Sequence, residues 1–258
     1  MTWTTLPRSE GAIRAGSGPR VVLLHGVGLR AEAWGAQIDD LAGDHGVVAF
    51  DMPGHGTAPR LNGVVTLEAY TDRLAAMLAG SAVIVGHSMG AMIALDLAVR
   101  YPALVRGVVA MNAIFQRTPE AAQAVQRRAT ELDGVHAADP SGAIARWFGQ
   151  ADSAEARACR AWLMQVDPAG YRDAYTTFAR ADGPDPGDLQ HMQAPALFLT
   201  GADDPNSTPA MSHAMARIAP RGRAAVVPGA AHMLPMTHAA SVNQTLRAFI
   251  ADGLSQGA

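Results

Sequence analysis

The stretch from residue 83 to residue 97 constrains the fold of this chain more than any other. Residues 83–85 (Val-Ile-Val) form a β-branched run that is typical of a buried strand. The run breaks at Gly86, and apolar residues then recur at helical spacing: Met89, Met92, Ile93, Leu95 and Leu97. Gly86 and Gly90 flank Ser88 in a G-x-S-x-G pattern, where side chains at the two outer positions would clash with the bend. The sequence therefore predicts a strand, a tight turn at Ser88 and a helix.

Ser88 lies at the start of this predicted helix, where unpaired N–H groups and the helix dipole favour a developing negative charge. An ordinary strand-to-helix turn with a capping serine is the alternative interpretation. We favour a nucleophilic serine, because the strand and the helix that the motif requires are both present.

The rest of the chain alternates apolar runs with helical patterns. The predicted strands include 21–24, 46–50, 105–111, 195–200 and 224–228, and an edge hairpin is expected from 2–6 and 11–15. Predicted helices cover 31–42, 66–79, 208–219 and 241–251. This order predicts an α/β fold with a mostly parallel sheet of about eight strands, flanked by helices on both faces.

The alternation stops between residues 113 and 190. This segment is rich in Ala, Arg, Asp and aromatic residues, and prolines and glycines interrupt its helical pattern. We predict a helical insertion over 113–190, with the core domain formed by 1–112 and 191–258.

Composition excludes several classes of function. A net charge of −3 over 258 residues does not indicate nucleic acid or an anionic membrane as a partner. All 20 basic residues are arginine, which excludes lysine Schiff bases and P-loops. Cys159 is the only cysteine, and no two histidines have metal-ligand spacing, so we expect neither disulfides nor a metal. Without a signal-peptide pattern or an apolar run of 18 residues, we expect a soluble cytoplasmic protein.

Two later strand ends carry the groups that a serine nucleophile needs. Residues 201–205 (Gly-Ala-Asp-Asp-Pro) follow one strand, and residues 229–233 (Gly-Ala-Ala-His-Met) follow the next. Because carboxyl ends of parallel strands share one edge of the sheet, we expect His232 and a carboxylate to meet there. Physical reasoning from the sequence does not decide whether this carboxylate is Asp203 or the adjacent Asp204.

Five motifs in order resemble the α/β-hydrolase superfamily: residues 25–26 (His-Gly), 51–56 (Asp-Met-Pro-Gly-His-Gly), 86–90 (Gly-His-Ser-Met-Gly), 201–205 and 231–233 (Ala-His-Met). The resemblance implies Ser88 as nucleophile, His232 as general base and, by family spacing, Asp204 as the orienting acid. It places the oxyanion hole at the backbone N–H groups of Val27 and Met89. It also implies that 113–190 is a cap inserted after the sixth strand.

The resemblance implies a serine hydrolase that cleaves a small carboxylic ester or lactone through an acyl-enzyme, without a cofactor. One alternative is carbon–carbon bond hydrolysis of a vinylogous diketone, although relatives of that type often carry tryptophan where Met233 stands. Another alternative is a catalytically silent binding module, a class that usually loses a member of the triad.

Aromatic residues gather in the insertion, and we predict Trp147, Phe148 and Trp162 as substrate contacts. The alternative is that they form the core of the insertion. Arginines 117, 157, 160, 172 and 180 are expected on solvated helix faces, and a single one turned inward would select an anionic substrate. By resemblance, His25, His55 and His87 are expected to pack or to brace loops.

Overall fold

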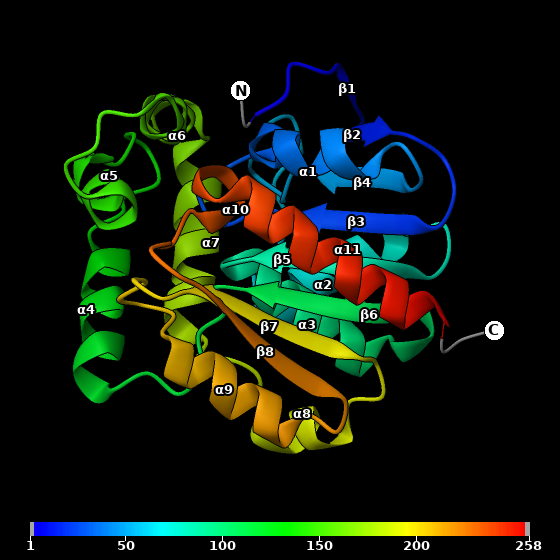
Figure 1. The fold of residues 1–258 in the computed structure, drawn as a ribbon. Helices are drawn as coiled ribbons and strands as arrows, with labels where there is room; N and C mark the ends of the chain where they lie inside the picture. Colours follow the sequence, from blue (N-terminus) through cyan, green and yellow to red (C-terminus); the bar gives the residue numbers. More distant parts are fainter. Residues whose placement is uncertain (1–2, 256–258) are drawn as a thin grey trace.

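The apolar runs form an eight-stranded sheet in the computed structural model of the chain, which describes residues 3–255 and the side chains of residues 3–252 (Figure 1). In sheet order the strands are β1 (Arg8–Ser9), β2 (Ala12–Ala15), β4 (Gly46–Phe50), β3 (Arg20–Leu24), β5 (Ala82–His87), β6 (Val105–Met111), β7 (Ala196–Gly201) and β8 (Gly222–Val227). Strands β3 to β8 run parallel, and β2 pairs antiparallel with both β1 and β4. The predicted fold class is confirmed.

Helices cover both faces of the sheet because successive strand residues point to opposite sides. In β3, Val21 and Leu23 pack with α1 (Gly35–Leu41) and α11 (Ala239–Ser255). Val22 and Leu24 pack with α2 (Leu67–Met77) and α3 (Met89–Arg100) on the other face. This double burial explains why the strand is apolar at four consecutive positions. The other helical elements outside the segment between β6 and β7 are η1 (Ala31–Trp34), η2 (Pro102–Leu104), α9 (Pro209–Ile218) and α10 (Leu234–Thr237).

Five helices lie between β6 and β7: α4 (Pro119–Thr130), α5 (Ser141–Phe148), α6 (Ala154–Gln165), α7 (Pro168–Arg180) and α8 (Pro186–His191). The first four, which we call the cap helices, gather at one end of the sheet (Figure 1). The fifth, α8, places Leu189 in the buried layer formed with α3 and α9. The segment therefore returns to the core layer before β7 begins.

The amino-terminal hairpin differs from the predicted one. Its first arm is β1, Arg8–Ser9, whereas residues 3–6 are not in a strand and residue 2 lies outside the described residues. The turn falls at Glu10 and Gly11, which both have positive φ. Between residues 3 and 255, no helix has both the length and the apolar character to span a bilayer.

Candidate active site

The turn between β5 and α3 holds Ser88 in a strained conformation. Its φ is 56° and its ψ is −117°, a region that costs a non-glycine residue about 1–3 kcal/mol. The flanking glycines allow this bend. A Cβ on Gly86 would collide with the backbone of Gly90, and a Cβ on Gly90 would collide with the carbonyl of Leu24. The turn therefore sets Ser88 at the amino end of α3. The residue as a whole is 9% exposed.

The loop after β3 lies directly beside Ser88. A Cβ on Gly26 would be 3.0 Å from the Ser88 Cβ, a tight contact that glycine avoids. Val27 follows in the turn that the Leu29 N–H closes on the Gly26 carbonyl (3.2 Å). Met89 is the first residue of α3, where backbone N–H groups have no partner within the helix. Val27 and Met89, both predicted for an oxyanion hole, thus stand on the two segments that flank Ser88.

Two buried histidines fix that loop to the loop after β4. The Gly28 N–H donates to His55 Nε2 at 3.0 Å, and the Met52 N–H donates to His25 Nε2 at 2.9 Å. The other ring nitrogens point to carbonyls: His25 Nδ1 donates to Gly26 O at 2.8 Å and His55 Nδ1 to Pro53 O at 3.2 Å. Burial is the main cause that lowers the pKa of His25 to about 4 and that of His55 to about 3. Both rings are neutral braces.

His232 lies beside the serine turn and is held from two sides. The ring of His87, the residue before Ser88, lies 4.9 Å from the His232 ring, and His87 Nε2 donates to the His232 carbonyl at 2.8 Å. His232 Nδ1 donates to Asp204 Oδ2 at 2.7 Å. Asp204 is 2% exposed, whereas Asp203 is exposed to solvent. The structure therefore brings Asp204, and not its neighbour, to His232.

Asp204 is held as a carboxylate by several donors. Its Oδ1 accepts from the N–H groups of Asn206 (2.9 Å) and Ser207 (3.2 Å). Burial works to raise the pKa of Asp204, but the charge and hydrogen bond of His232 and the hydrogen bonds from Asn206 and Asn112 outweigh it and lower the pKa to about 2. A buried anion at this position orients the His232 ring, leaves Nε2 as the basic nitrogen and stabilises an imidazolium.

Sequence reasoning missed Asn112, which is buried and follows β6. Its Nδ2 donates to Asp204 Oδ2 at 2.6 Å, on the same oxygen that His232 contacts. Asn112 also has a positive φ of 50°. Its position could have indicated a role at the site, because Asn112 directly follows an apolar strand and so lies at the sheet edge where Ser88 and Asp204 also lie.

The three predicted substrate contacts on the cap helices, Trp147, Phe148 and Trp162, differ in what they pack against. The Trp147 ring stacks on the His232 ring, with centroids 6.0 Å apart and planes 22° from parallel. Phe148 and Trp162 are half-buried and pack against an apolar cluster that joins α5 and α6 to Met233 and Met236. Of the three, the structure places only Trp147 in contact with a predicted catalytic side chain.

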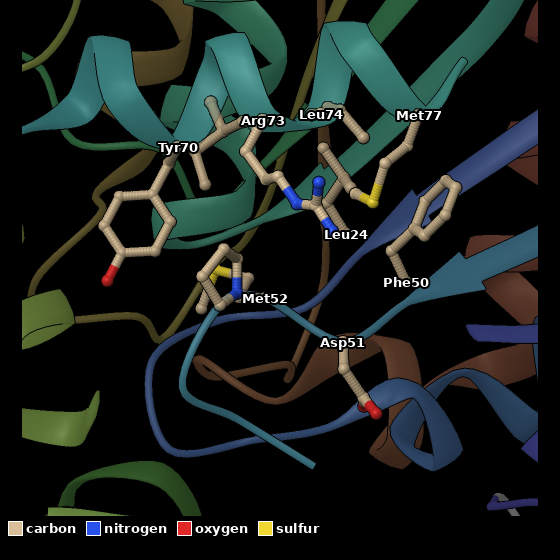
Figure 2. Close-up of a pocket in the computed structure, with 10 residues that line it drawn as sticks. Leu24, Phe50, Asp51, Met52, Tyr70, Arg73, Leu74 and Met77 are labelled. Carbon is tan, nitrogen blue, oxygen red and sulfur yellow. The ribbon is translucent and has the colours of Figure 1, made fainter. Parts of the chain in front are cut away.

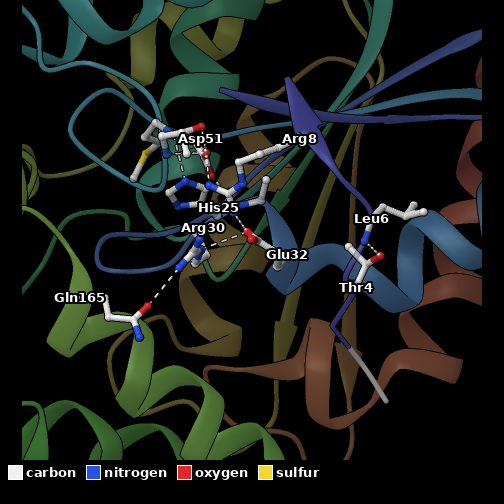
Figure 3. Close-up of polar contacts among 11 residues, drawn as sticks. Thr4, Leu6, Arg8, His25, Arg30, Glu32, Asp51 and Gln165 are labelled. Atoms are coloured by element: carbon white, nitrogen blue, oxygen red, sulfur yellow. Dashed lines mark hydrogen bonds and ion pairs between the residues drawn. The ribbon is translucent and has the colours of Figure 1, made fainter. Parts of the chain in front are cut away.

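Several contacts fasten the cap helices to the loops at the site. A Cβ on Gly28 would collide with Leu163 of α6 and would be 3.0 Å from Tyr171 Cε2 of α7. Arg30 Nη1 donates to Gln165 Oε1 at 3.3 Å, which links the loop after β3 to the end of α6 (Figure 3). Figure 3 also shows Arg8 at Asp51, the carboxylate that anchors the loop after β4 (2.6 Å). The cap helices therefore contact the loop that carries Val27.

A separate small cavity lies between α2 and strands β3 and β4 (Figure 2). Its volume is about 20 Å³, and Tyr70, Leu74, Met77 and Phe50 supply much of its apolar lining. That volume holds about one water molecule and is too small for an ester. None of the predicted catalytic residues lines it, so it belongs to the core packing.

The arginines singled out from the sequence make structural contacts or face solvent. Arg157 pairs with Asp152, and Arg172 pairs with Asp173. Arg117 donates to the carbonyls of Ala181 (2.5 Å) and Phe178 (3.3 Å), while Arg160 and Arg180 are exposed. The side chains described for residues 3–252 include no group of three His, Cys, Asp or Glu arranged to hold a metal ion.

Comparison with known proteins places this geometry among hydrolases. The sequence model of the Alpha/beta hydrolase family matches residues 21–245. The chain is 36% identical, over 249 residues and 94% of each chain, to (E)-2-((N-methylformamido)methylene)succinate hydrolase of Acinetobacter baylyi.

Solved structures of hydrolases share the fold across nearly the whole chain. A thermophilic esterase from Thermogutta terrifontis, with malate bound, has a TM-score of 0.83 at 27% identity and covers 94% of this chain and 93% of its own. The enol-lactonase from Burkholderia xenovorans has a TM-score of 0.81 at 25% identity, with 93% and 95% covered.

Proposed function

The chain belongs to the alpha/beta hydrolase family, and we propose that it is a serine hydrolase that cleaves a small carboxylic ester or lactone through an acyl-enzyme. One observation carries the proposal: His232 is hydrogen-bonded to the buried Asp204 while its carbonyl is bound by the residue that precedes Ser88. The esterase and the lactonase of similar structure support the same class of reaction.

In the proposed mechanism the Ser88 Oγ attacks the substrate carbonyl carbon, and His232 Nε2 takes the hydroxyl proton. The carbonyl oxygen becomes an oxyanion, which the N–H groups of Val27 and Met89 stabilise. Collapse of the tetrahedral intermediate breaks the bond to the leaving alkoxide, which takes the proton from His232. Water then attacks the acyl-enzyme and gives its proton to His232. The second tetrahedral intermediate then collapses, the bond from the acyl carbon to Ser88 Oγ breaks, Oγ takes the proton back from His232, and the carboxylic acid product is released.

A second candidate reaction is the hydrolysis of an acylaminomethylene succinate, the kind of compound named for the Acinetobacter baylyi relative. The identity of 36% across 94% of both chains favours this candidate. The same serine, histidine and oxyanion hole would serve it, because an amide carbonyl also passes through a tetrahedral oxyanion.

The test is a substrate panel of short-chain esters, lactones, an acylaminomethylene succinate and a vinylogous diketone, assayed with the wild type and Ser88→Ala. We expect turnover of at least one ester or lactone, and a loss of about a thousandfold or more in Ser88→Ala. Ser212→Ala is the matched control, because it removes a buried serine on α9 that takes no part in the proposed site. Turnover that survives in folded Ser88→Ala would contradict the proposal, and turnover of the diketone alone would replace the ester with a carbon–carbon bond.

A further inference from the structure

Two arginines from different cap helices meet a pair of tyrosines on α7. Arg128 of α4 donates through Nη1 to the Tyr175 hydroxyl oxygen at 2.7 Å. The Tyr175 ring stacks with the Tyr171 ring, with centroids 5.8 Å apart. Arg146 of α5 is half-buried, and its charge interacts with that of Arg128 and with Tyr171. We call these four residues the arginine–tyrosine cluster.

The positive charge of this cluster has no counter-ion in the protein. Neither Arg128 nor Arg146 has a carboxylate within 4.0 Å among the side chains of residues 3–252, in contrast to Arg157 and Arg172 of the same segment. Both are half-buried. Burial and the neighbouring Arg128 charge lower the pKa of Arg146. Two adjacent cations without an anion are destabilising, and a bound anion would relieve both the desolvation and the repulsion.

Two members of the arginine–tyrosine cluster are linked to the segments around the proposed catalytic residues. Arg146 immediately precedes Trp147, whose ring stacks on His232. Tyr171 lies against Gly28, where an added Cβ would be 3.0 Å from its Cε2, and Gly28 follows Val27 in the loop after β3, which we call the oxyanion loop. The cluster is therefore joined through Tyr171 to the loop that carries Val27, and through Arg146 to α5, the helix whose Trp147 ring stacks on His232.

We propose that Arg128 and Arg146 bind a carboxylate group of the substrate, so that the substrate is an ester, lactone or amide that also carries a free carboxylate. The inference rests on the proposed function and names its substrate class. Arg128 leaves further guanidinium donors for the carboxylate. The Tyr175 hydroxyl, which accepts from Arg128, keeps its own proton to donate. A planar guanidinium binds a carboxylate in bidentate geometry, which fixes the distance from the anion to the scissile carbonyl.

The binding test uses Ser88→Ala protein, which cannot turn its ligand over, with monomethyl succinate and dimethyl succinate as probes in calorimetry. We expect the charged monoester to bind at least about tenfold more tightly than the neutral diester. Adding Arg146→Gln should remove most of that difference, whereas Arg127→Gln, an exposed arginine on α4, should leave it. Equal binding of both probes, or an equal effect of Arg127→Gln, would overturn the proposal. Sulfate that competes as well as succinate would also overturn it, because the site would then bind anions in general.

Stability measurements separate a structural role from a binding role. No hydrogen bond joins the Arg146 side chain to a described residue, so Arg146→Gln should fold with an unchanged or slightly raised Tm. A lowered Tm with unchanged probe binding would overturn the proposal. Arg128→Gln removes the partner of Tyr175, and if that variant does not fold, Arg146→Gln alone decides the result.

A kinetic comparison distinguishes this inference from the proposed function. With Ser88 intact, we expect the kcat/KM of the monoester to exceed that of the diester, and Arg146→Gln to lower it about ten- to a hundredfold through KM. If both esters are cleaved with equal kcat/KM in the wild type and in Arg146→Gln, the proposal of a carboxylate site is wrong, whereas the proposal of a serine hydrolase still holds. If neither these esters nor any member of the substrate panel is cleaved while the Ser88→Ala binding result holds, the hydrolase proposal fails and the anion site remains.

Discussion

Acidification from about pH 7 to about pH 5 should destabilise this fold strongly, because three histidines are buried in the neutral form. His25, His55 and His87 are each no more than 2% exposed. Burial is the largest cause that lowers their pKa values, to about 4 for His25 and about 3 for His55 and His87. In the unfolded chain each has a pKa of about 6.5.

The sign follows from proton binding in the two states. Between about pH 6.5 and pH 4 these three histidines are protonated in the unfolded chain but stay neutral in the folded protein. The free energy of unfolding therefore decreases as the pH falls. Each histidine contributes up to about 1.4 kcal/mol per pH unit. From about pH 7 to about pH 5 the loss is about 2 kcal/mol for each, or about 6 kcal/mol together. That is comparable with the total stability of an ordinary domain, about 5–15 kcal/mol.

The assay is urea unfolding at a series of pH values, followed by far-UV circular dichroism. His87→Gln should reduce the pH slope by about a third, whatever it does to the stability at neutral pH. His213→Gln, which removes an exposed histidine on α9, is the matched control and should keep the slope. Asp204 contributes separately, because its lowered pKa adds stability that is lost only as the pH falls from about 4 towards about 2. A free energy of unfolding that stays constant from neutral pH to about pH 5 would refute the reasoning.

Three further predictions concern the residues around the site. Asp204→Asn should lower kcat by on the order of 10⁴, since it deprives His232 of the anion that fixes its tautomer, whereas Asp203→Asn should change kcat by less than about threefold; reversed losses would assign the acid to Asp203. His55→Phe should lower kcat about tenfold at similar KM, because the Gly28 N–H loses its acceptor and the oxyanion loop loses its brace, and His55→Gln should restore part of the loss. Trp147→Ala should raise KM or change acyl preference more than it lowers Tm, because the ring stacks on His232; an earlier melt with unchanged kinetics would make Trp147 a residue of the cap core.

The sequence predicted the sheet and the serine turn well because local rules determine both. Burial on both faces requires the unbroken apolar runs, such as Val21 to Leu24, and the register then follows from the alternation of side chains. The positive φ of Ser88 follows from Gly86 and Gly90, whose neighbours leave no room for a Cβ. The hairpin differed because β1 begins only at Arg8, on a short edge where patterning is weak.

Sequence patterns could not predict which arginines of the cap helices lack a carboxylate partner. Arg128 and Arg146 have the same local character as Arg157 or Arg172, and only the packing of α4, α5 and α7 decides which of them lack carboxylate partners. Asn112 was missed for a similar reason. Its contact with Asp204 joins residues 92 positions apart, which single-sequence spacing does not reveal.

Covalent labelling with a fluorophosphonate shows whether Ser88 is an activated nucleophile. The intact mass of the folded wild type should increase by one label per chain, and peptide mapping should place that label on Ser88. Ser88→Ala should not be labelled, and Asp204→Asn should be labelled far more slowly because His232 is no longer oriented. An unlabelled wild-type protein, or a label on a different serine, would mean that Ser88 is not the nucleophile.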